Sequence, residues 1–426
     1  MPLPGTTPAL EAAPQPRSGL GPALLWACFL GCSWTWVIGM FLPIMLLRDF
    51  GVWGWVVFAV PNMLGAAAMG TVLARPEVSW NLVQKHPGAL RWFAGITIAY
   101  QIYVVFWLFN YLWLAVIWVV PWLVMDKPRR EALGAWLPTI GVGVAVLSWG
   151  AFSMAESLDG AWLDVSTDTL PSRLTALDLW ILAPGLVTGF FLCPYLDPTF
   201  HRARYSTGPG TGKIAFAVGF GVVFASMIVF TLMYAGLMRP VINGEPGAAD
   251  TITSPWKVLL AIHIGIQVAF TLLVHARERF AVVEKKDRWP LVWFGLVMLG
   301  ALGWAVVSRT TGIVVPTHSG HDLTLGEAGY RAFLLIYGVF FPAYVLICMI
   351  PTLRSGHQPS LAARRKVFWV ASIVSYPLAM MGLIVGPMIW LLGLYGTLAA
   401  GRVVVELWPA SGGPSTTAAT DTDTTA

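Results

Sequence analysis

Charged side chains are scarce in this sequence. Asp, Glu, Lys and Arg together make up 11% of the 426 residues, whereas hydrophobic residues make up 57% and the mean hydropathy is +0.71. Soluble domains carry about 25% charged residues, so this composition excludes an ordinary soluble protein. The net charge of +5 says little about nucleic acid, and we expect no nucleic-acid partner. The composition predicts an all-α polytopic membrane protein embedded in a lipid bilayer.

Metal-ligand and catalytic motifs are also missing. The four cysteines have no further His or Cys at metal-ligand spacing, so we predict small buried hydrophobic residues and no metal site. These are Cys28, Cys32, Cys193 and Cys348. The sequence contains no GxSxG, no HExxH and no pair of intramembrane carboxylates. We therefore expect no enzyme, no catalytic residues and no cofactor other than a coupling ion, with Na⁺ and H⁺ as candidates.

What the sequence does contain is a series of long apolar runs. A membrane-spanning helix needs about 20 such residues, and the runs predict 11 or 12 transmembrane helices. The run 90–125 is too long for one crossing and is divided near Asn110, and the run 367–406 is split near Gly386 and Pro387. The other predicted spans are 22–47, 52–74, 133–152, 178–198, 214–237, 255–276, 289–307 and 329–352.

The distribution of Lys and Arg predicts an orientation. With the N-terminus in the cytoplasm, the inner loops hold 18 basic residues and the outer segments hold six: Arg48, Arg173, Arg239, Lys257, Arg309 and Arg331. Inner loops of membrane proteins carry this excess of positive charge. We expect a multi-pass protein of the inner (plasma) membrane with a cytoplasmic N-terminus.

This topology divides the chain into six segments. Low-complexity composition predicts disordered tails at 1–19 and 409–426. Two five-helix units of opposite orientation, 20–152 and 178–352, are separated by an acidic extracytoplasmic loop at 153–177. Residues 353–408 form one or two accessory helices. Opposite orientation is typical of an inverted repeat, in which the first helix of each unit is commonly discontinuous.

The sixth predicted span is the most interrupted. Its apolar run contains two Pro and two Gly residues, and hydrocarbon tolerates broken backbone only beside protein or a water-filled cavity. The aromatic residues Phe190 and Tyr195 make this interrupted run a candidate substrate platform. Asp197 and Arg202, at its cytoplasmic exit, are predicted to form a gate. For Asp197 the alternative is a helix cap or an ion pair with a neighbouring Arg.

The first span contains Gly31, Cys32 and Ser33 about a third of the way in. Such residues can mark an unwound helix whose oxygens bind a cation, or a close-packing face between helices. Trp36 is a candidate for stacking on a substrate, with helix packing as the alternative. In the second span, Asn62 needs a hydrogen-bond partner, and the small residues that follow it predict close helix packing.

Polar side chains recur every four residues in the eighth span. His263, Gln267, Thr271 and His275 fall on one stripe of the helix, which lipid would exclude, so we expect it to face the bundle interior or water. A histidine there can carry a proton because its pKa lies near neutrality. His263, Gln267 and Thr271, with Gly31 and Cys32, are the candidate cation or proton site.

The five-plus-five pattern resembles the leucine-transporter fold of the amino acid–polyamine–organocation superfamily. Within it, residues 189–202, GFFLCPYLDPTFHR, look most like the sixth core helix of the sodium:solute symporters, with Cys193 where that family has Gln. The resemblance implies substrate contacts on the first and sixth helices, at Ser33, Trp36, Phe190, Cys193 and Tyr195. The family completes its sodium site with a Ser-Thr pair on the eighth helix, whereas this chain has Gln267 and Thr271 in that region.

The sequence therefore predicts a secondary active transporter that moves a small-molecule solute by alternating access, and it leaves open whether transport is coupled to a cation or a proton or is uncoupled. The alternatives are a transporter-like sensor or receptor, a non-transporting membrane scaffold subunit and, least favoured, an intramembrane enzyme. The solute, the coupling ion, the side of the C-terminus and the oligomeric state stay open.

Overall fold

The computed structural model describes residues 16–110, 112–158, 174–280, 289–318, 320, 322–353 and 359–408. The predicted tail 409–426 lies outside these ranges, as do residues 1–15 of the other tail and 159–173 of the acidic segment.

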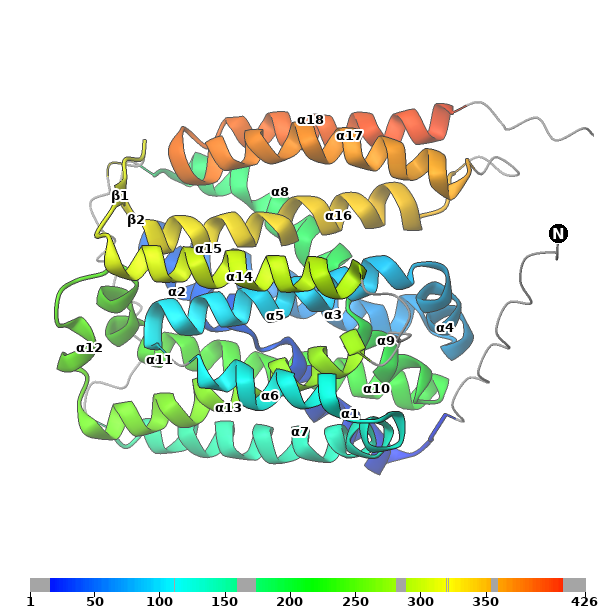
Figure 1. Ribbon diagram of the computed structural model, residues 1–426, viewed down its shortest axis with the longest axis horizontal. Helices are drawn as coiled ribbons and strands as arrows, with labels where there is room; N and C mark the ends of the chain where they lie inside the picture. The colour runs from blue at the N-terminus through cyan, green and yellow to red at the C-terminus, as the bar shows by residue number, and fades with distance from the viewer. Residues whose placement is uncertain are drawn as a thin grey trace, which may run out of the picture.

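Helices make up almost all of the described chain (Figure 1). The first predicted unit contains α1 Leu20–Trp34, α2 Val37–Phe50, α3 Val52–Val72, α4 Pro76–Lys85, α5 Pro87–Phe109, α6 Trp113–Val124 and α7 Lys127–Ala155. The second contains α8 Ala176–Leu192, the 3₁₀ turn η1 Cys193–Leu196, α9 Pro198–Tyr205, α10 Pro209–Val218, the π-helical η2 Gly219–Phe224, α11 Ala225–Ile242, α12 Ala248–Thr251, α13 Ser254–Phe280 and α14 Trp289–Thr310.

The second unit continues with a short antiparallel pair, β1 Val314–Val315 and β2 Leu323–Thr324, and ends with α15 Leu325–Leu335, η3 Ile336–Phe340, α16 Phe341–Tyr344 and η4 Val345–Met349. The accessory segment contains α17 Leu361–Met380, η5 Met381–Val385 and α18 Trp390–Leu407, and η3, η4 and η5 are π-helical.

The helices have the length and composition of membrane spans. In the described ranges, ten are long and apolar enough to cross a bilayer, or eleven when α1 and α2 are counted as one span bent by 58°. Large apolar side chains point outward, among them Trp180, Leu299 and Val370, each at least 66% exposed. Such a surface is stable only in lipid. The chain is an all-α, multi-pass membrane protein, as the composition predicts.

The division of the run 90–125 at Asn110 is confirmed. Asn110 ends α5 in the left-handed conformation, with φ 60°. Arg309 at the end of α14 donates to the carbonyls of Phe106 and Trp107, while Arg130 at the start of α7 donates to that of Phe280. Since these contacts lie at opposite ends of the bundle (Figure 1), α6 carries the chain back across it. Its 12 residues span only about 18 Å.

The two ends of the bundle carry different elements. α12 and the β1–β2 pair lie at one, here called the Arg48 end, and α4 and α9 lie at the other, the Arg202 end (Figure 1). The backbone N–H of Arg17 donates to the carbonyl of Ser206, after α9. The carboxylate of Glu406 accepts from the backbone of Leu353, beyond the end of η4. Both ends of the described chain therefore lie at the Arg202 end.

Small residues let α3 approach α8 closely. A Cβ atom built on Gly65 would lie 2.5 Å from the carbonyl oxygen of Phe190. Ala66 is fully buried in the same face. The predicted close-packing face of the second span is confirmed.

This contact makes a prediction for stability. Gly65→Ala is expected to lower the free energy of unfolding by about 1–3 kcal/mol, because the added methyl group forces the backbones of α3 and α8 apart. Gly143→Ala in α7 is the matched control, since a Cβ there meets nothing within 4 Å. Thermal unfolding in detergent would measure both. Equal melting temperatures for the two variants would contradict the close packing.

Candidate functional site

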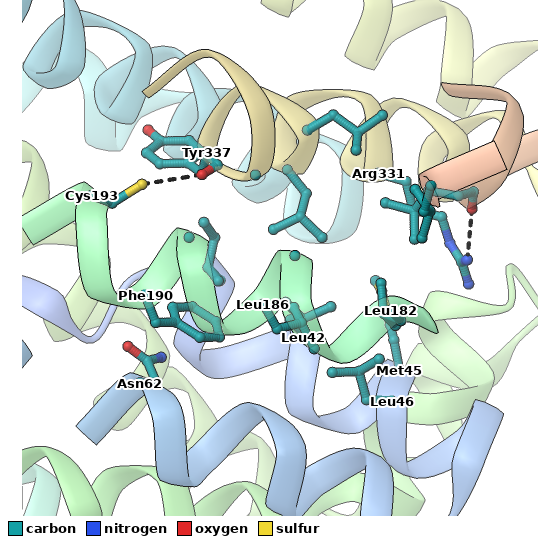
Figure 2. Close-up of a pocket in the computed structure, with 18 of the residues that line it drawn as sticks. Leu42, Met45, Leu46, Asn62, Leu182, Leu186, Phe190, Cys193, Arg331 and Tyr337 are labelled. Carbon is teal, nitrogen blue, oxygen red and sulfur yellow. Dashed lines mark hydrogen bonds between the residues drawn. The ribbon is translucent and has the colours of Figure 1, made fainter. Parts of the chain in front are cut away.

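A cavity of about 90 Å³ lies between α2, α8, η3 and α18. Figure 2 shows its lining, with Asn62, Phe190 and Tyr337 toward one end and Arg331 toward the other. The lining is mostly apolar and includes Trp34, Trp36, Gly39, Leu42, Leu186, Gly189, Cys193, Gly338 and Leu391. Its Trp34 end is at the bend between α1 and α2, so two helix ends and a cavity meet there.

Aromatic rings form the Trp34 end of this cavity. The ring of Trp36 contacts the rings of Trp34 and Tyr337 edge-on, with centroids 4.7 and 5.1 Å apart. The indole Nε1 of Trp34 donates to Oδ1 of Asn62 over 2.7 Å, which supplies the partner that Asn62 needs. The Cys193 thiol donates to the Tyr337 carbonyl over 3.1 Å (Figure 2). Asn62 and Cys193 are thus engaged, whereas the indole Nε1 of Trp36 has no hydrogen-bond partner among the described residues.

A buried network of charges closes the Arg48 end. Arg48 binds Glu327 through two nitrogens, at 2.9 and 2.6 Å, and its Nε donates to Asp49 at 2.8 Å. Arg331 donates to Glu327 at 2.7 Å and to Asp49 at 2.8 Å. Asn243 accepts a further bond from Arg48. This Arg48 network joins α2, α15 and the end of α11, and Asp49 and Arg331 also line the cavity.

A second network closes the Arg202 end. Arg202 of α9 pairs with Glu278 of α13 at 3.1 Å and donates to the Gly134 carbonyl of α7 at 2.6 Å. Arg277 pairs with the same carboxylate at 2.7 Å. His201 bonds to Ser79 of α4 at 2.7 Å. α9 is therefore tied to three other helices on this side of the bundle.

Asp197 begins α9 as its N-cap and is fully buried. Its Oδ1 accepts from the backbone N–H and the hydroxyl of Thr199, at 2.8 and 2.7 Å. In the described part of the chain, Oδ2 has no hydrogen-bond partner. Burial, reinforced by the charge of Glu278, raises the pKa of Asp197 to about 7, against the opposing Thr199 bonds. The Thr199 hydroxyl oxygen also lies 3.3 Å from that of Ser33 in α1, so Thr199 lies between this carboxyl and the bent helix.

The polar stripe of α13 is buried, as the spacing predicts. Gln267 donates to the Ser148 hydroxyl at 2.9 Å, and the ring of His275 lies 5.8 Å from that of Trp36. His263 packs against Phe230. Among the described residues, both histidines and the Thr271 hydroxyl have unpartnered polar atoms. Buried polar groups of this kind usually pair with water or take part in function.

The candidate substrate contacts separate into two groups. Trp36, Phe190 and Cys193 line the cavity. Ser33 instead donates to the Leu30 carbonyl and faces Thr199, and the Tyr195 carbonyl accepts from His201. These two residues lie on the side of α9.

The candidate cation ligands of the first span are helical. α1 continues to Trp34, and the bend follows at Thr35 and Trp36. A Cβ on Gly31 would lie 2.6 Å from Val223, so this glycine packs closely against η2. The Cys32 thiol donates to the Gly141 carbonyl over 3.5 Å. Of the two interpretations of these small residues, the geometry of Gly31 favours packing.

The predicted gate residues also differ in their partners. Asp197 caps α9, as one alternative expected, while Arg202 pairs with Glu278. Sequence reasoning missed Tyr337, which lies in an unbroken apolar run. It also missed the Arg48 network, although Glu327 and Arg331 at i, i+4 beside a span were a usable signal.

The fold and the site together define a polytopic helical membrane protein with an internal cavity. Comparison with protein-family models, curated proteins and solved structures gives no match for this chain. In the residues that the structure describes, no group of three or more His, Cys, Asp or Glu side chains could hold a metal ion.

Proposed function

We propose that this protein is a secondary transporter that carries a small solute through the bundle by alternating access. One observation carries the proposal: a cavity at the bend of the first span lies between two networks of ion pairs that join different helices, one at each end of the bundle, and the Arg48 network reaches the cavity lining through Asp49 and Arg331. Breaking one set while the other holds would open the cavity to one side only. Helices that repack between two discrete arrangements are the usual means of such switching.

The lining indicates the class of solute. Indole, phenyl and aliphatic side chains surround the Trp34 end of the cavity, where the amide of Asn62 and the thiol of Cys193 are polar groups, while the charges of Asp49 and Arg331 at the other end are already paired within the Arg48 network. An ion would lose its hydration there without compensation. We therefore propose a small neutral solute with an aromatic or aliphatic body, bound between Trp36, Phe190 and Tyr337.

We also propose the five-plus-five inverted repeat and the kinship with sodium:solute symporters. The helix contacts support this. Where a helix of the first unit packs on a helix of the second, the corresponding helix of the second unit packs on the corresponding helix of the first. α5 packs on α14 as α13 packs on α6, and α3 packs on α8 as α10 and η2 pack on α1. The bend at Thr35 and the η1 turn after α8 fall at matching places. Discontinuous helices at these positions are typical of the arrangement.

For the coupling ion we propose a proton carried by Asp197. Its carboxyl is buried, has an oxygen with no partner among the described residues and reaches α1 through Thr199 and Ser33. Neutralising it would favour closure of the Arg202 end, since a buried charge without a partner is costly. The stripe of His263, Gln267 and Thr271 stays a second candidate.

Orientation is proposed from charge. The Arg202 end carries most of the basic residues of the described chain, including Arg75, Arg130, Arg204 and Arg364. Loops rich in Lys and Arg remain in the cytoplasm. We propose that this end, with both chain ends, faces the cytoplasm in the plasma membrane.

Uptake into proteoliposomes tests the transport function. The purified protein is expected to accumulate at least one labelled neutral aromatic or aliphatic solute against its gradient when an inward pH gradient is imposed. Gly338→Leu should abolish this uptake, because Gly338 lines the cavity and a Cβ there meets nothing within 4 Å. The leucine would therefore fill the space without disturbing the backbone.

Gly150→Leu, on the exposed face of α7, is the control for that variant and should transport normally. The proposal would be overturned if neither the wild-type protein nor the control took up any of the labelled neutral solutes when the pH gradient is imposed. Saturable binding without flux would favour the sensor alternative.

A further inference from the structure

A second cavity, which shares no lining residue with the first, lies at the Arg48 end. Its volume is about 390 Å³, and it is bordered by α5, α6, α11 and α13. The apolar lining consists of Val105, Leu108, Phe109, Leu114, Met238, Val241, Ala249, Ile252, Leu260, Ala261, Ile264, Gly265 and Val268. Two cations, Lys257 and Arg309, complete it. An apolar cavity bordered by two cations is complementary to an amphiphile with an apolar tail and an anionic headgroup.

The short helix α6 accounts for the space. Its 12 residues cover about 18 Å of a hydrocarbon core about 30 Å thick. Leu114, in its first turn, borders the cavity, while Trp113, Val116 and Ile117 are exposed on its outer face. The neighbouring spans are longer, so α6 leaves part of one leaflet's depth unfilled beside α5 and α13.

The depth of the cavity matches one leaflet. Along α13 the lining runs from Lys257, in the first turn, to Val268. These eleven steps cover about 16 Å, which is close to half of the hydrocarbon core. A single acyl chain of a phospholipid occupies this depth.

The two cations lie where a headgroup would be. Lys257 and Arg309 are exposed and belong to the terminal turns of α13 and α14. Arg309 is held over the end of α5 by its bonds to the Phe106 and Trp107 carbonyls, at 3.3 and 3.1 Å. Basic side chains at span ends attract anionic headgroups. Asp250 adjoins Ala249 on α12 but does not line the cavity.

We propose that this cavity binds one acyl chain of an anionic phospholipid, whose headgroup phosphate contacts Lys257 and Arg309. The site is separate from the transport cavity, and the inference does not rest on the proposed function.

Native mass spectrometry of the full-length protein tests the site. Delipidated protein in detergent is titrated with phosphatidylglycerol or with phosphatidylcholine that has the same acyl chains. We expect one tightly retained phosphatidylglycerol, preferred by roughly tenfold or more because two cations face its headgroup. Inorganic phosphate should not displace it, since the acyl chain anchors it.

Two variants distinguish the contribution of the lipid's acyl chain to binding from that of its headgroup. Lys257→Gln combined with Arg309→Gln should remove the preference for phosphatidylglycerol. Gly265→Leu should abolish retention of both lipids, because a Cβ at Gly265 meets nothing within 4 Å and the side chain would fill the cavity. Gly150→Leu is the matched control and should retain the lipid. Retention unchanged in Gly265→Leu, or equal retention of the two lipids by the wild-type protein, would overturn the proposal.

Discussion

Glu327→Gln is expected to lower the free energy of unfolding by about 3–5 kcal/mol, the usual cost of removing one partner from a buried ion pair. The Glu327 carboxylate accepts from both Arg48 and Arg331, and its side chain is 1% exposed. Without it, two guanidinium groups share the single carboxylate of Asp49. One buried positive charge is then left without compensation, and desolvation makes it costly.

Thermal unfolding followed by tryptophan fluorescence would measure this loss. Glu131→Gln is the control, since Glu131 forms an ion pair with Lys127 in which both side chains are more than 60% exposed. Exposed pairs contribute about 0–1 kcal/mol, so this variant should unfold like the wild-type protein.

A double variant tests whether the missing partner is the cause. Arg48→Met combined with Glu327→Leu removes both charges, leaves the Arg331–Asp49 pair intact and should recover much of the lost stability. If Glu327→Gln and Glu131→Gln unfold at the same temperature, the Arg48 network does not hold α2 to α15.

Asp197→Asn is expected to abolish accumulation driven by a pH gradient while leaving exchange of labelled for unlabelled solute. Asn keeps the shape and the cap of α9 but cannot bind or release a proton at this position. Proteoliposomes loaded with solute would measure exchange, and an imposed gradient would measure accumulation. Asp126→Asn is the matched control, because Asp126 is also an N-cap but is solvent-exposed. Gradient-driven accumulation by Asp197→Asn would remove Asp197 from the coupling mechanism.

Asp197→Asn is also expected to change how the free energy of unfolding depends on pH. Burial raises the pKa of Asp197 to about 7, so the folded protein holds this proton more tightly than the unfolded chain. Ionisation of this carboxyl therefore does not change the free energy of unfolding below about pH 4. It lowers that free energy increasingly as the pH rises, and the loss is complete above about pH 7.

Asn cannot ionise, so Asp197→Asn should become more stable than the wild-type protein over that interval. The difference should reach a few kcal/mol, since each pKa unit corresponds to about 1.4 kcal/mol. Melting temperatures at pH 5 and pH 8 would measure it. A difference that does not change between pH 5 and pH 8 would show that Asp197 does not titrate in this interval.

Much of the fold could be predicted because span positions depend on local composition. The run 90–125 was too long for one crossing, and its division at Asn110 agrees with the left-handed cap there. Polar residues at four-residue spacing on α13 predicted a buried stripe, and all four are buried. The short length of α6 was not predicted, because hydropathy does not distinguish a 12-residue helix from a full span when its linkers are also apolar.

The candidate site was predicted only in part. Trp36, Phe190 and Cys193 line the cavity. They could be predicted because breaks and aromatic residues in an apolar run are local signals. The bend lies after Gly31, Cys32 and Ser33 rather than at them. Small residues are compatible with either a break or close packing, and the choice depends on the neighbouring helix η2.

The sequence by itself determined that this protein lives in a bilayer, where its crossings lie and which helix faces must avoid lipid. These properties follow from the preference of each short segment for water or hydrocarbon. Only the tertiary structure decided that Arg48 pairs with Glu327, 279 residues away, that both described chain ends lie at one side and that two cavities remain between the helices. Such pairings depend on which helices pack together, and many packings satisfy the same pattern of hydropathy.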